Sequence, residues 1–301
     1  MRGREGRRRL VPRRATSFQS IALLMLVPIT GILLFLGWRF LSTRHAVAVT
    51  SRPAIPALAP RTAVTAPATR VEVASLSARP SRPARIVLIL DDVGFDHQQL
   101  AQAMRIDPNL NFAVIPNGVR ASEAANELHA GGFEILCHMP MEPDGYPGIS
   151  PGAGAILTSM SDAEIRATTS ANLHGVPYAR GVNNHMGSRA TADSRVMSNV
   201  LASFPRGTYF IDSRTTPHSI GEQTAKALHV PTAARNVFLD DVQSEPAIRR
   251  QLAELVSLAE SRGLAIGIGH IYPVTVKVLS EEVPSLRARG VQFVRASVVV
   301  N

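Results

Sequence analysis

From residue 86 onward, short apolar runs alternate with stretches of helical periodicity. The apolar runs, each of strand length, are 86–90, 111–115, 133–137, 180–184, 209–212, 237–239, 264–268 and 291–294. Helix caps and glycine stops place helices between them, at 121–130, 161–173, 192–204, 220–228, 244–263 and from 274 onward. Strands that alternate with helices at this spacing form a parallel sheet. We therefore predict an α/β fold, an irregular or incomplete (β/α) barrel of seven or eight strands.

The chain begins with a basic segment followed by a long apolar run. Seven arginines fall within the first 14 residues, and the run from Ile21 to Trp38 would span about 27 Å as a helix. We predict a basic cytoplasmic tail at 1–20 and a signal anchor at 21–41 in the inner membrane, with the C-terminal domain periplasmic or otherwise extracytoplasmic. A cleaved signal peptide is the alternative, because Ala46 and Ala48 fit an A-x-A cleavage site.

Residues 42–83 are rich in Pro, Ala, Arg, Thr and Ser. Such a segment buries too little apolar surface to offset its ordering entropy, so we predict a disordered linker ahead of a folded domain at 84–301. Residues 1–83 hold 14 Arg and 2 Glu, a net charge of +12, and the remainder carries a net charge of −3. A mildly acidic domain argues against nucleic acid as a partner. The single cysteine, Cys137, lies in an apolar run and is expected to be a buried small hydrophobe.

Polar side chains recur just past the ends of the predicted strands. They are Asp91 and Asp92, His138, the run Asn183, Asn184 and His185, Asp212, Asp240 and Asp241, and His270. Each alone has an ordinary explanation as a turn or cap residue. In a parallel barrel, however, the carboxyl ends of all strands meet at one rim. The recurrence therefore predicts a shared site there, whereas the absence of a G-x-G-x-x-G or P-loop motif after the first strand disfavours nucleotide binding.

The residue types in this set are those of a metal site. Two imidazoles and one carboxylate suit Zn²⁺ or another first-row divalent ion and leave a coordination position open for water. The natural ligands are His138, His185 and one of Asp91 or Asp92. We therefore predict a divalent metal cofactor, with Zn²⁺ the expected ion.

Six motifs, in chain order LDDVG, HMPMEP, NNHMGS, DSRT, FLDD and GIGH, together resemble the divergent polysaccharide deacetylase family. This family is a distant branch of the carbohydrate-esterase deacetylases, which have an irregular (β/α) barrel, and the resemblance covers 85–301. The wider deacetylases carry T-F-D-D, in which the first aspartate is a general base and the second a metal ligand. The resemblance thus implies that Asp91 is the base and Asp92 the ligand. It likewise implies that His270 is the general acid.

The second deacetylase motif, H-x-x-x-H, is incomplete in this chain. His138 matches the first histidine, but Glu142 stands in place of the second. We expect His185 to replace the missing ligand, with Glu142 as the fallback. From their chemistry we expect Asp212 and Arg214 to orient the histidine or bind substrate, and Asn183 and Asn184 to hydrogen-bond sugar hydroxyls or the oxyanion. The full set of residues expected to bind substrate or to support the site is Asn183, Asn184, Asp212, Arg214, Glu142, Asp240 and Asp241.

The expected function is that of a membrane-anchored, metal-dependent hydrolase. It would remove acetyl groups from an envelope polysaccharide or amino sugar, its partners being that acetylated glycan and the inner membrane. Two alternatives remain open at this stage. One is an inactive barrel that binds glycan or an envelope partner, and the other is a metal-dependent hydrolase of another bond, such as a phosphoester or peptide.

Overall fold

The computed structural model describes residues 83–300. The predicted basic tail, the predicted anchor and nearly all of the predicted linker lie outside these residues, and within 83–300 no helix is both long and apolar enough to cross a bilayer. The described elements, in chain order, are β1 (Arg85–Val93), α2 (His97–Ala103), β2 (Asn111–Val114), α3 (Ala121–Ala130), β3 (Glu134–Met141), α4 (Asp162–His174), β4 (Gly181–Met186), α5 (Ser194–Ala202), β5 (Tyr209–Asp212), α6 (Gly221–Ala227), β6 (Thr232–Ala234), β7 (Val237–Phe238), α7 (Glu245–Arg262), β8 (Leu264–His270), α8 (Pro273–Ala288) and β9 (Gln292–Phe293).

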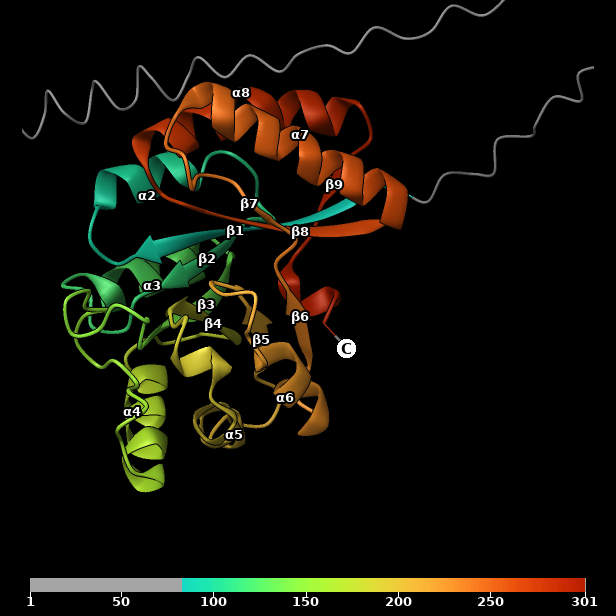
Figure 1. Cartoon of the computed structure of the whole chain (residues 1–301). Helices are drawn as coiled ribbons and strands as arrows, with labels where there is room; N and C mark the ends of the chain where they lie inside the picture. The colour runs from blue at the N-terminus through green and yellow to red at the C-terminus, as the bar shows by residue number, and fades with distance from the viewer. Residues whose placement is uncertain (1–82, 301) are drawn as a thin grey trace, which may run out of the picture. The chain divides into compact units, whose positions relative to one another are not determined.

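The strands form one parallel sheet that curls into a half-barrel. Their order is β6-β5-β4-β3-β2-β1-β8-β7, with β9 paired to the start of β1. The two edge strands, β6 and β7, are joined by Arg235 and Asn236 alone, so the last residue of β6 and the first residue of β7 are at most about 11 Å apart. Helices surround the sheet: α7 and α8 lie side by side along β1 and β8, and α4 packs along β3 with α5 beside it (Figure 1). This arrangement is consistent with the predicted (β/α) barrel.

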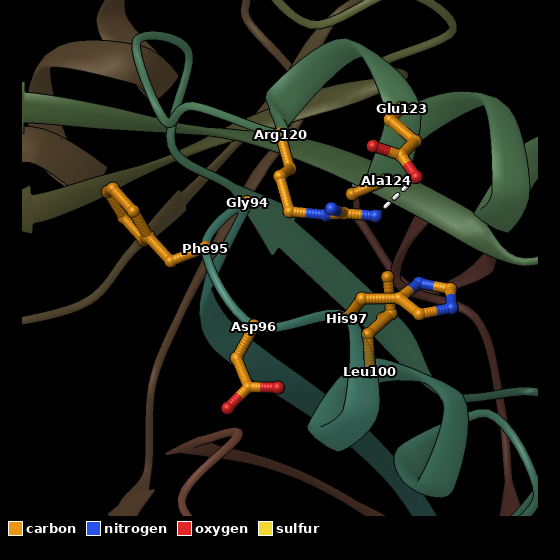
Figure 2. A pocket seen from close by; sticks show the side chains of 8 residues that line it. All are labelled: Gly94, Phe95, Asp96, His97, Leu100, Arg120, Glu123 and Ala124. Carbon is orange, nitrogen blue, oxygen red and sulfur yellow. Dashed lines mark hydrogen bonds and ion pairs between the residues drawn. The ribbon is translucent and has the colours of Figure 1, made fainter.

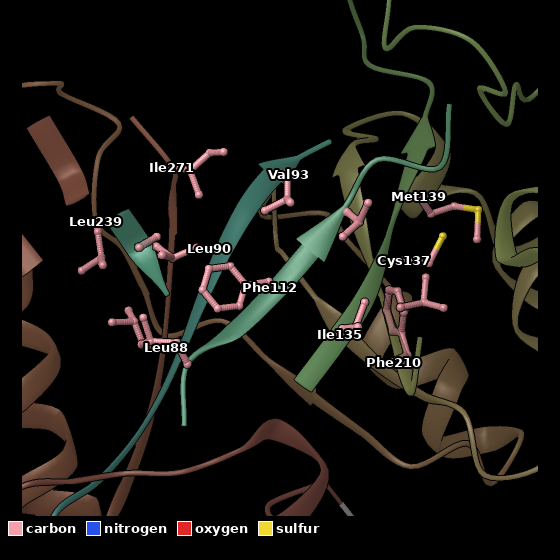
Figure 3. Packing of buried hydrophobic residues seen from close by; sticks show 14 of the residues in the cluster. Leu88, Leu90, Val93, Phe112, Ile135, Cys137, Met139, Phe210, Leu239 and Ile271 are labelled. Atoms are coloured by element: carbon pink, nitrogen blue, oxygen red, sulfur yellow. The ribbon is translucent and has the colours of Figure 1, made fainter. Parts of the chain in front are cut away.

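Alternate residues of each strand face opposite sides of the sheet. In β1, Leu88 and Leu90 belong to the larger apolar layer under the helices, whereas Val87 and Ile89 face the smaller layer inside the half-barrel. Figure 3 shows Leu88, Leu90 and Phe112 gathered on the helix-facing side, with Ile135 and Cys137 farther along the same layer. Strand β1 is buried on both faces, as its unbroken apolar run indicates.

Several predicted helix signals are found in the structure. The Ser161 hydroxyl accepts a hydrogen bond from the backbone N–H of Glu164, and the Glu164 carboxylate accepts one from the backbone N–H of Ser161, so the capping box of α4 is complete. Helix α7 ends at Gly263, which adopts the left-handed conformation with φ of 81°. Ser244 occupies the N-cap of α7, but its side chain makes no capping hydrogen bond.

The amino ends of the strands are closed by the last residues of the domain. The Ser297 backbone N–H and hydroxyl donate hydrogen bonds of 2.6 and 2.7 Å to the buried carboxylate of Glu134, which begins β3. The Tyr209 hydroxyl, at the start of β5, donates to the same carboxylate over 2.9 Å. The backbone N–H of Ala296 donates to the side chain of Asn111, the first residue of β2. The carboxyl ends of the strands are thus the edge at which a site remains accessible.

Candidate metal centre and active site

Strand alternation carries most of the candidate side chains into the mouth of the half-barrel. Asp91 continues the inward series of Val87 and Ile89, and His138 follows the inward-facing Leu136 by two residues. In the same way, His270 follows the inward-facing Ile268. Residue pairing then sets their neighbours: Asp91 lies opposite His270 on β8, and His138 lies opposite Asn183 on β4.

Asp92, His138 and His185, which together form the metal group, converge on one point. The Asp92 Oδ1 atom lies 3.3 Å from His138 Nε2 and 3.1 Å from His185 Nδ1, and the two nitrogens are 3.2 Å apart. Asp92 reaches this position because its backbone takes the left-handed conformation, with φ of 61°, which removes its side chain from the strand's alternation. Backbone conformations of this kind are costly for a residue other than glycine and gather at functional sites.

The chemistry of this group fits a divalent metal. The buried Asp92 Oδ1 has no hydrogen-bond partner within 83–300, and a buried oxygen of this kind calls for a ligand or ion. Burial opposes ionisation of Asp92, but the two histidines outweigh it and lower its pKa, so the carboxylate stays charged. Two imidazole nitrogens and one carboxylate oxygen form a suitable set for Zn²⁺ with an open position. Asp92, not Asp91, is therefore the aspartate that the structure groups with the histidines.

Asn183 orients both His138 and Asp91. Its amide Nδ2 donates a hydrogen bond of 2.9 Å to Asp91 Oδ1, so its Oδ1 is the atom that faces His138 Nδ1, at 3.0 Å. His138 must then carry its proton on Nδ1, which leaves the lone pair of Nε2 directed at the metal site. We expected Asn183 either to bind substrate or to support the site residues. Its side chain is fully buried and both ends of its amide are engaged, which fits the supporting role.

Asp91 lies beside the metal group but outside it. Its Oδ2 is 3.5 Å from His138 Nε2, and the residue is only 3% exposed. Burial raises the pKa of Asp91, although His138, His270 and Asn183 oppose the rise. A carboxyl group whose pKa is raised is a stronger proton acceptor once ionised, which suits a general base.

His270, on the strand next to that of Asp91, is held by Asp240. Asp240 accepts hydrogen bonds from His270 Nδ1 at 3.0 Å, from the His270 backbone N–H at 2.7 Å and from the Thr275 hydroxyl at 2.7 Å. The other ring nitrogen, Nε2, lies 3.7 Å from Asp92 Oδ2. Burial disfavours the charged ring, but Asp240 and the neighbouring aspartates prevail and raise the pKa of His270 to about 9. The Tyr272 ring also stacks on the His270 imidazole, with 4.8 Å between the ring centroids.

Five expected site residues lie away from this centre. The carboxylate of Glu142, the fallback ligand, is hydrogen-bonded by Thr158 and paired with Arg189 at 2.9 Å. Asp212 follows the outward-facing Phe210 by two residues, so its carboxylate caps the loop to α6 instead of orienting a histidine. The side-chain oxygen of Asn184 accepts a hydrogen bond from the backbone N–H of Ser213. Arg214 and Asp241 are exposed beside a second cavity.

A cavity of about 390 Å³ opens next to the metal group. Asp92 and His185 form one wall, and its other lining residues are Phe95, Ile115, Asn117 and the loop 150–153. Figure 2 shows how Phe95 comes to lie there: beyond Gly94 its side chain turns away from the Arg120–Glu123 ion pair and from His97. Phe95 is 52% exposed, so its ring is accessible from the cavity. Its sequence signal, an aromatic residue directly after the first strand motif, went unused in the sequence-based prediction.

The fold and the site together define a class of protein, the (β/α) barrels that carry a metal-competent Asp-His-His group at the carboxyl ends of their strands. Within this class, the chain belongs to the divergent polysaccharide deacetylase family, whose model matches residues 88–300. It is 33% identical over 223 residues to the uncharacterized protein YibQ of Escherichia coli K12, which covers 74% of this chain and 69% of YibQ. An uncharacterized protein of Haemophilus influenzae Rd is 33% identical over 197 residues, 65% of this chain and 70% of that protein.

A similar fold is found in a crystal structure. An uncharacterized protein from Agrobacterium tumefaciens C58 matches with a TM-score of 0.70 and 25% identity, over 74% of this chain and 91% of that one. The expected family and the deacetylase-type fold are thereby confirmed.

Proposed function

We propose that this protein is a metal-dependent deacetylase that hydrolyses acetyl groups on an envelope polysaccharide or amino sugar. The family acts on acetylated polysaccharides. The observation that carries the proposal is the convergence of Asp92, His138 and His185 around an unpartnered buried oxygen, with Asp91 and His270 next to them. A divalent cation held by these three side chains would supply Lewis acidity, polarising the acetyl carbonyl and making a water molecule more acidic.

The residues of the chain divide the remaining work. Asp91 accepts the proton of the attacking water, since it is an inward-facing carboxylate beside the metal group. His270 donates a proton to the departing amine or alcohol through Nε2, because its Nδ1 is held by Asp240. Asn183 fixes His138 and Asp91 in the required orientation.

The decisive test combines metal analysis with an assay for released acetate. The purified protein should hold about one zinc per chain and release acetate from acetylated chito-oligosaccharides, and chelation should stop the reaction. Asp92→Ala should lose the metal, whereas Asp91→Asn should retain it and lose about 10²- to 10⁴-fold in rate. Glu260→Gln, an exposed carboxylate on α7, is the matched control and should behave as wild type.

Two outcomes would overturn the proposal. Full activity in the presence of chelator would remove the metal from the reaction. A protein that binds zinc and acetylated glycan but releases no acetate would be a glycan-binding barrel, the alternative that the incomplete second motif first suggested.

We also propose that residues 21–41 anchor the protein in the inner membrane, with the deacetylase domain outside the cytoplasm. The support is the sequence pattern of an arginine-rich tail followed by an apolar run. Cell fractionation should place the full chain with the membrane, and protease added to spheroplasts should digest its C-terminal domain. Recovery of a shortened chain in the soluble periplasmic fraction would show that the segment is cleaved.

A further inference from the structure

A second cavity, of about 520 Å³, lies where the half-barrel is open. It is bounded by the loop after β5, by the connection between β6 and β7, and by α7. Its lining includes two arginines, Arg214 and Arg235, together with the ring of Phe238. Neither arginine forms an ion pair with a carboxylate of the described domain. Arg235 is half-buried and Arg214 is exposed, so the cavity presents two like charges that no direct ion pair neutralises.

Arg235 is held rigidly with one edge of its guanidinium unused. Its Nε donates to the carbonyl of Ser213 at 2.6 Å and its Nη2 donates to the carbonyl of Arg214 at 2.8 Å. Its plane lies over the Phe238 ring, with the central carbon 4.9 Å from the ring centroid. These contacts occupy the edge formed by Nε and Nη2. The opposite edge, formed by Nη1 and Nη2, retains the parallel N–H groups that bind a carboxylate in bidentate fashion.

Arg214 is presented from a strained turn. Its backbone has φ of 48°, in the left-handed region that few non-glycine residues adopt. Two hydrogen bonds hold it there, one from its N–H to Asp212 at 2.8 Å and one from Arg235 to its carbonyl. Its side chain is exposed at the cavity, so the turn directs a cation toward bound ligand.

Two carboxylates, Asp241 and Glu254, also line the cavity. Both are exposed, so water and salt screen their charges. Arg235 is half-buried against Phe238, and burial together with the neighbouring Arg214 lowers the pKa of its guanidinium, although Asp212, Asp91 and Asp241 oppose this fall. A bound anion would relieve this repulsion between the two arginines.

The cavity adjoins the proposed active site. Phe238 contacts Arg235 through one face, and its ring packs edge-on against His270 with 5.4 Å between centroids. A single aromatic ring thus separates the guanidinium from the proposed general acid. A group bound by the arginines would therefore belong to a sugar close to the one that loses its acetyl group.

We propose that Arg214 and Arg235 form a carboxylate-binding subsite, so that the substrate is an acidic polysaccharide with a carboxylated sugar beside the acetylated one. This inference rests on the proposed deacetylase function. It adds a substrate class that the three proposed metal ligands cannot define, since they act on the acetyl group alone.

The test uses two oligosaccharides that differ only in the carboxylate. One is a tetrasaccharide of alternating N-acetylglucosamine and glucuronic acid, and the other is its carboxyl-reduced form, in which each glucuronic acid has become glucose. The wild-type protein should show a kcat/KM at least roughly tenfold higher for the acidic form, mainly through KM. The preference should shrink as the salt concentration rises.

Substitutions test whether the two arginines cause the preference for the acidic oligosaccharide. Arg214→Gln and Arg235→Gln should each lose most of it, and Arg235→Lys should not restore it, because lysine lacks the planar fork. Arg206→Gln, which removes an exposed charge from the turn before β5, is the matched control and should keep the preference. Since Arg235 also supports a loop, Arg214→Gln, whose side chain is exposed, is the variant that separates binding from folding.

Binding measured by calorimetry on the Asp91→Asn protein decides the subsite independently of turnover. Tighter binding of the acidic form, lost in Arg214→Gln, supports the subsite even if no acetate is released, in which case the deacetylase proposal alone fails. Equal binding of both forms, or no binding of either, overturns the subsite. Equal hydrolysis of both forms would overturn it while leaving the deacetylase proposal intact.

Discussion

Replacing Asn183 with leucine tests how the centre is held together. The substitution keeps the approximate volume of the side chain but removes its hydrogen bonds to Asp91 and His138, at 2.9 and 3.0 Å. Both partners are almost completely buried, at 3% and 2% exposure, so water cannot replace the lost amide. Each unsatisfied buried group costs about 1–3 kcal/mol, which gives an expected loss of about 2–6 kcal/mol in the free energy of unfolding.

The same substitution should weaken metal binding. Without Asn183, the His138 ring is no longer restricted to the tautomer that directs Nε2 at the metal site. Loss of such an orienting partner typically costs about 10- to 100-fold in metal affinity. Zinc affinity is measured by competition with a chromogenic chelator, and stability by urea unfolding followed by circular dichroism. Asn126→Leu, at an exposed position on α3, is the matched control. If Asn183→Leu matched this control in both measurements, the role assigned to the amide would be wrong.

Three further predictions follow from named contacts. His185→Ala should lose zinc, whereas Glu142→Gln should retain zinc and lose only stability, because Glu142 pairs with Thr158 and Arg189. Equilibrium dialysis with metal analysis distinguishes the two variants, and loss of zinc in Glu142→Gln would contradict the ligand set. Burial raises the pKa of the Cys137 thiol, so a maleimide should label it after unfolding in urea but not in the native protein, as mass spectrometry would show. The pKa of His270 is raised to about 9 in the folded protein, against about 6.5 in the unfolded chain. In the presence of chelator, its contribution to the free energy of unfolding should be complete below pH 6.5 and fall by up to about 3 kcal/mol as the pH rises through 9. The fall should be smaller in Asp240→Asn, and a wild-type melting temperature that does not change with pH would contradict the prediction.

The sequence predicted the sheet well because its strands are buried on both faces. Strands of this kind appear as continuous apolar runs, and the runs at 86–90, 209–212 and 264–268 all lie within observed strands. The prediction missed one strand, β6, and one helix, α2. Strand β6 is only three residues of small side chains, and α2 is a seven-residue helix of mostly polar residues, so neither has a strong periodic signal.

Strand alternation explains which site residues the sequence could locate. His138 and His185 were expected just after strands, but β3 and β4 continue to Met141 and Met186 and carry them on the strands themselves. Counting alternate residues from the apolar runs would have placed Asp212 on the helix side. The position of Asp92 could not be obtained in this way, because its left-handed backbone breaks the alternation. The engagement of Glu142 by Thr158 and Arg189 depends on contacts between distant segments, which a single sequence does not reveal.

The half-barrel has two unlike ends, and the termini of the described domain lie at only one of them. The described domain starts at Arg85 and finishes with the segment that seals the amino ends of the strands, so both of its termini leave from the sealed end. The aspartates and histidines lie at the other end of the same strands. Both described termini therefore lie at the opposite end of the strands from the aspartates and histidines.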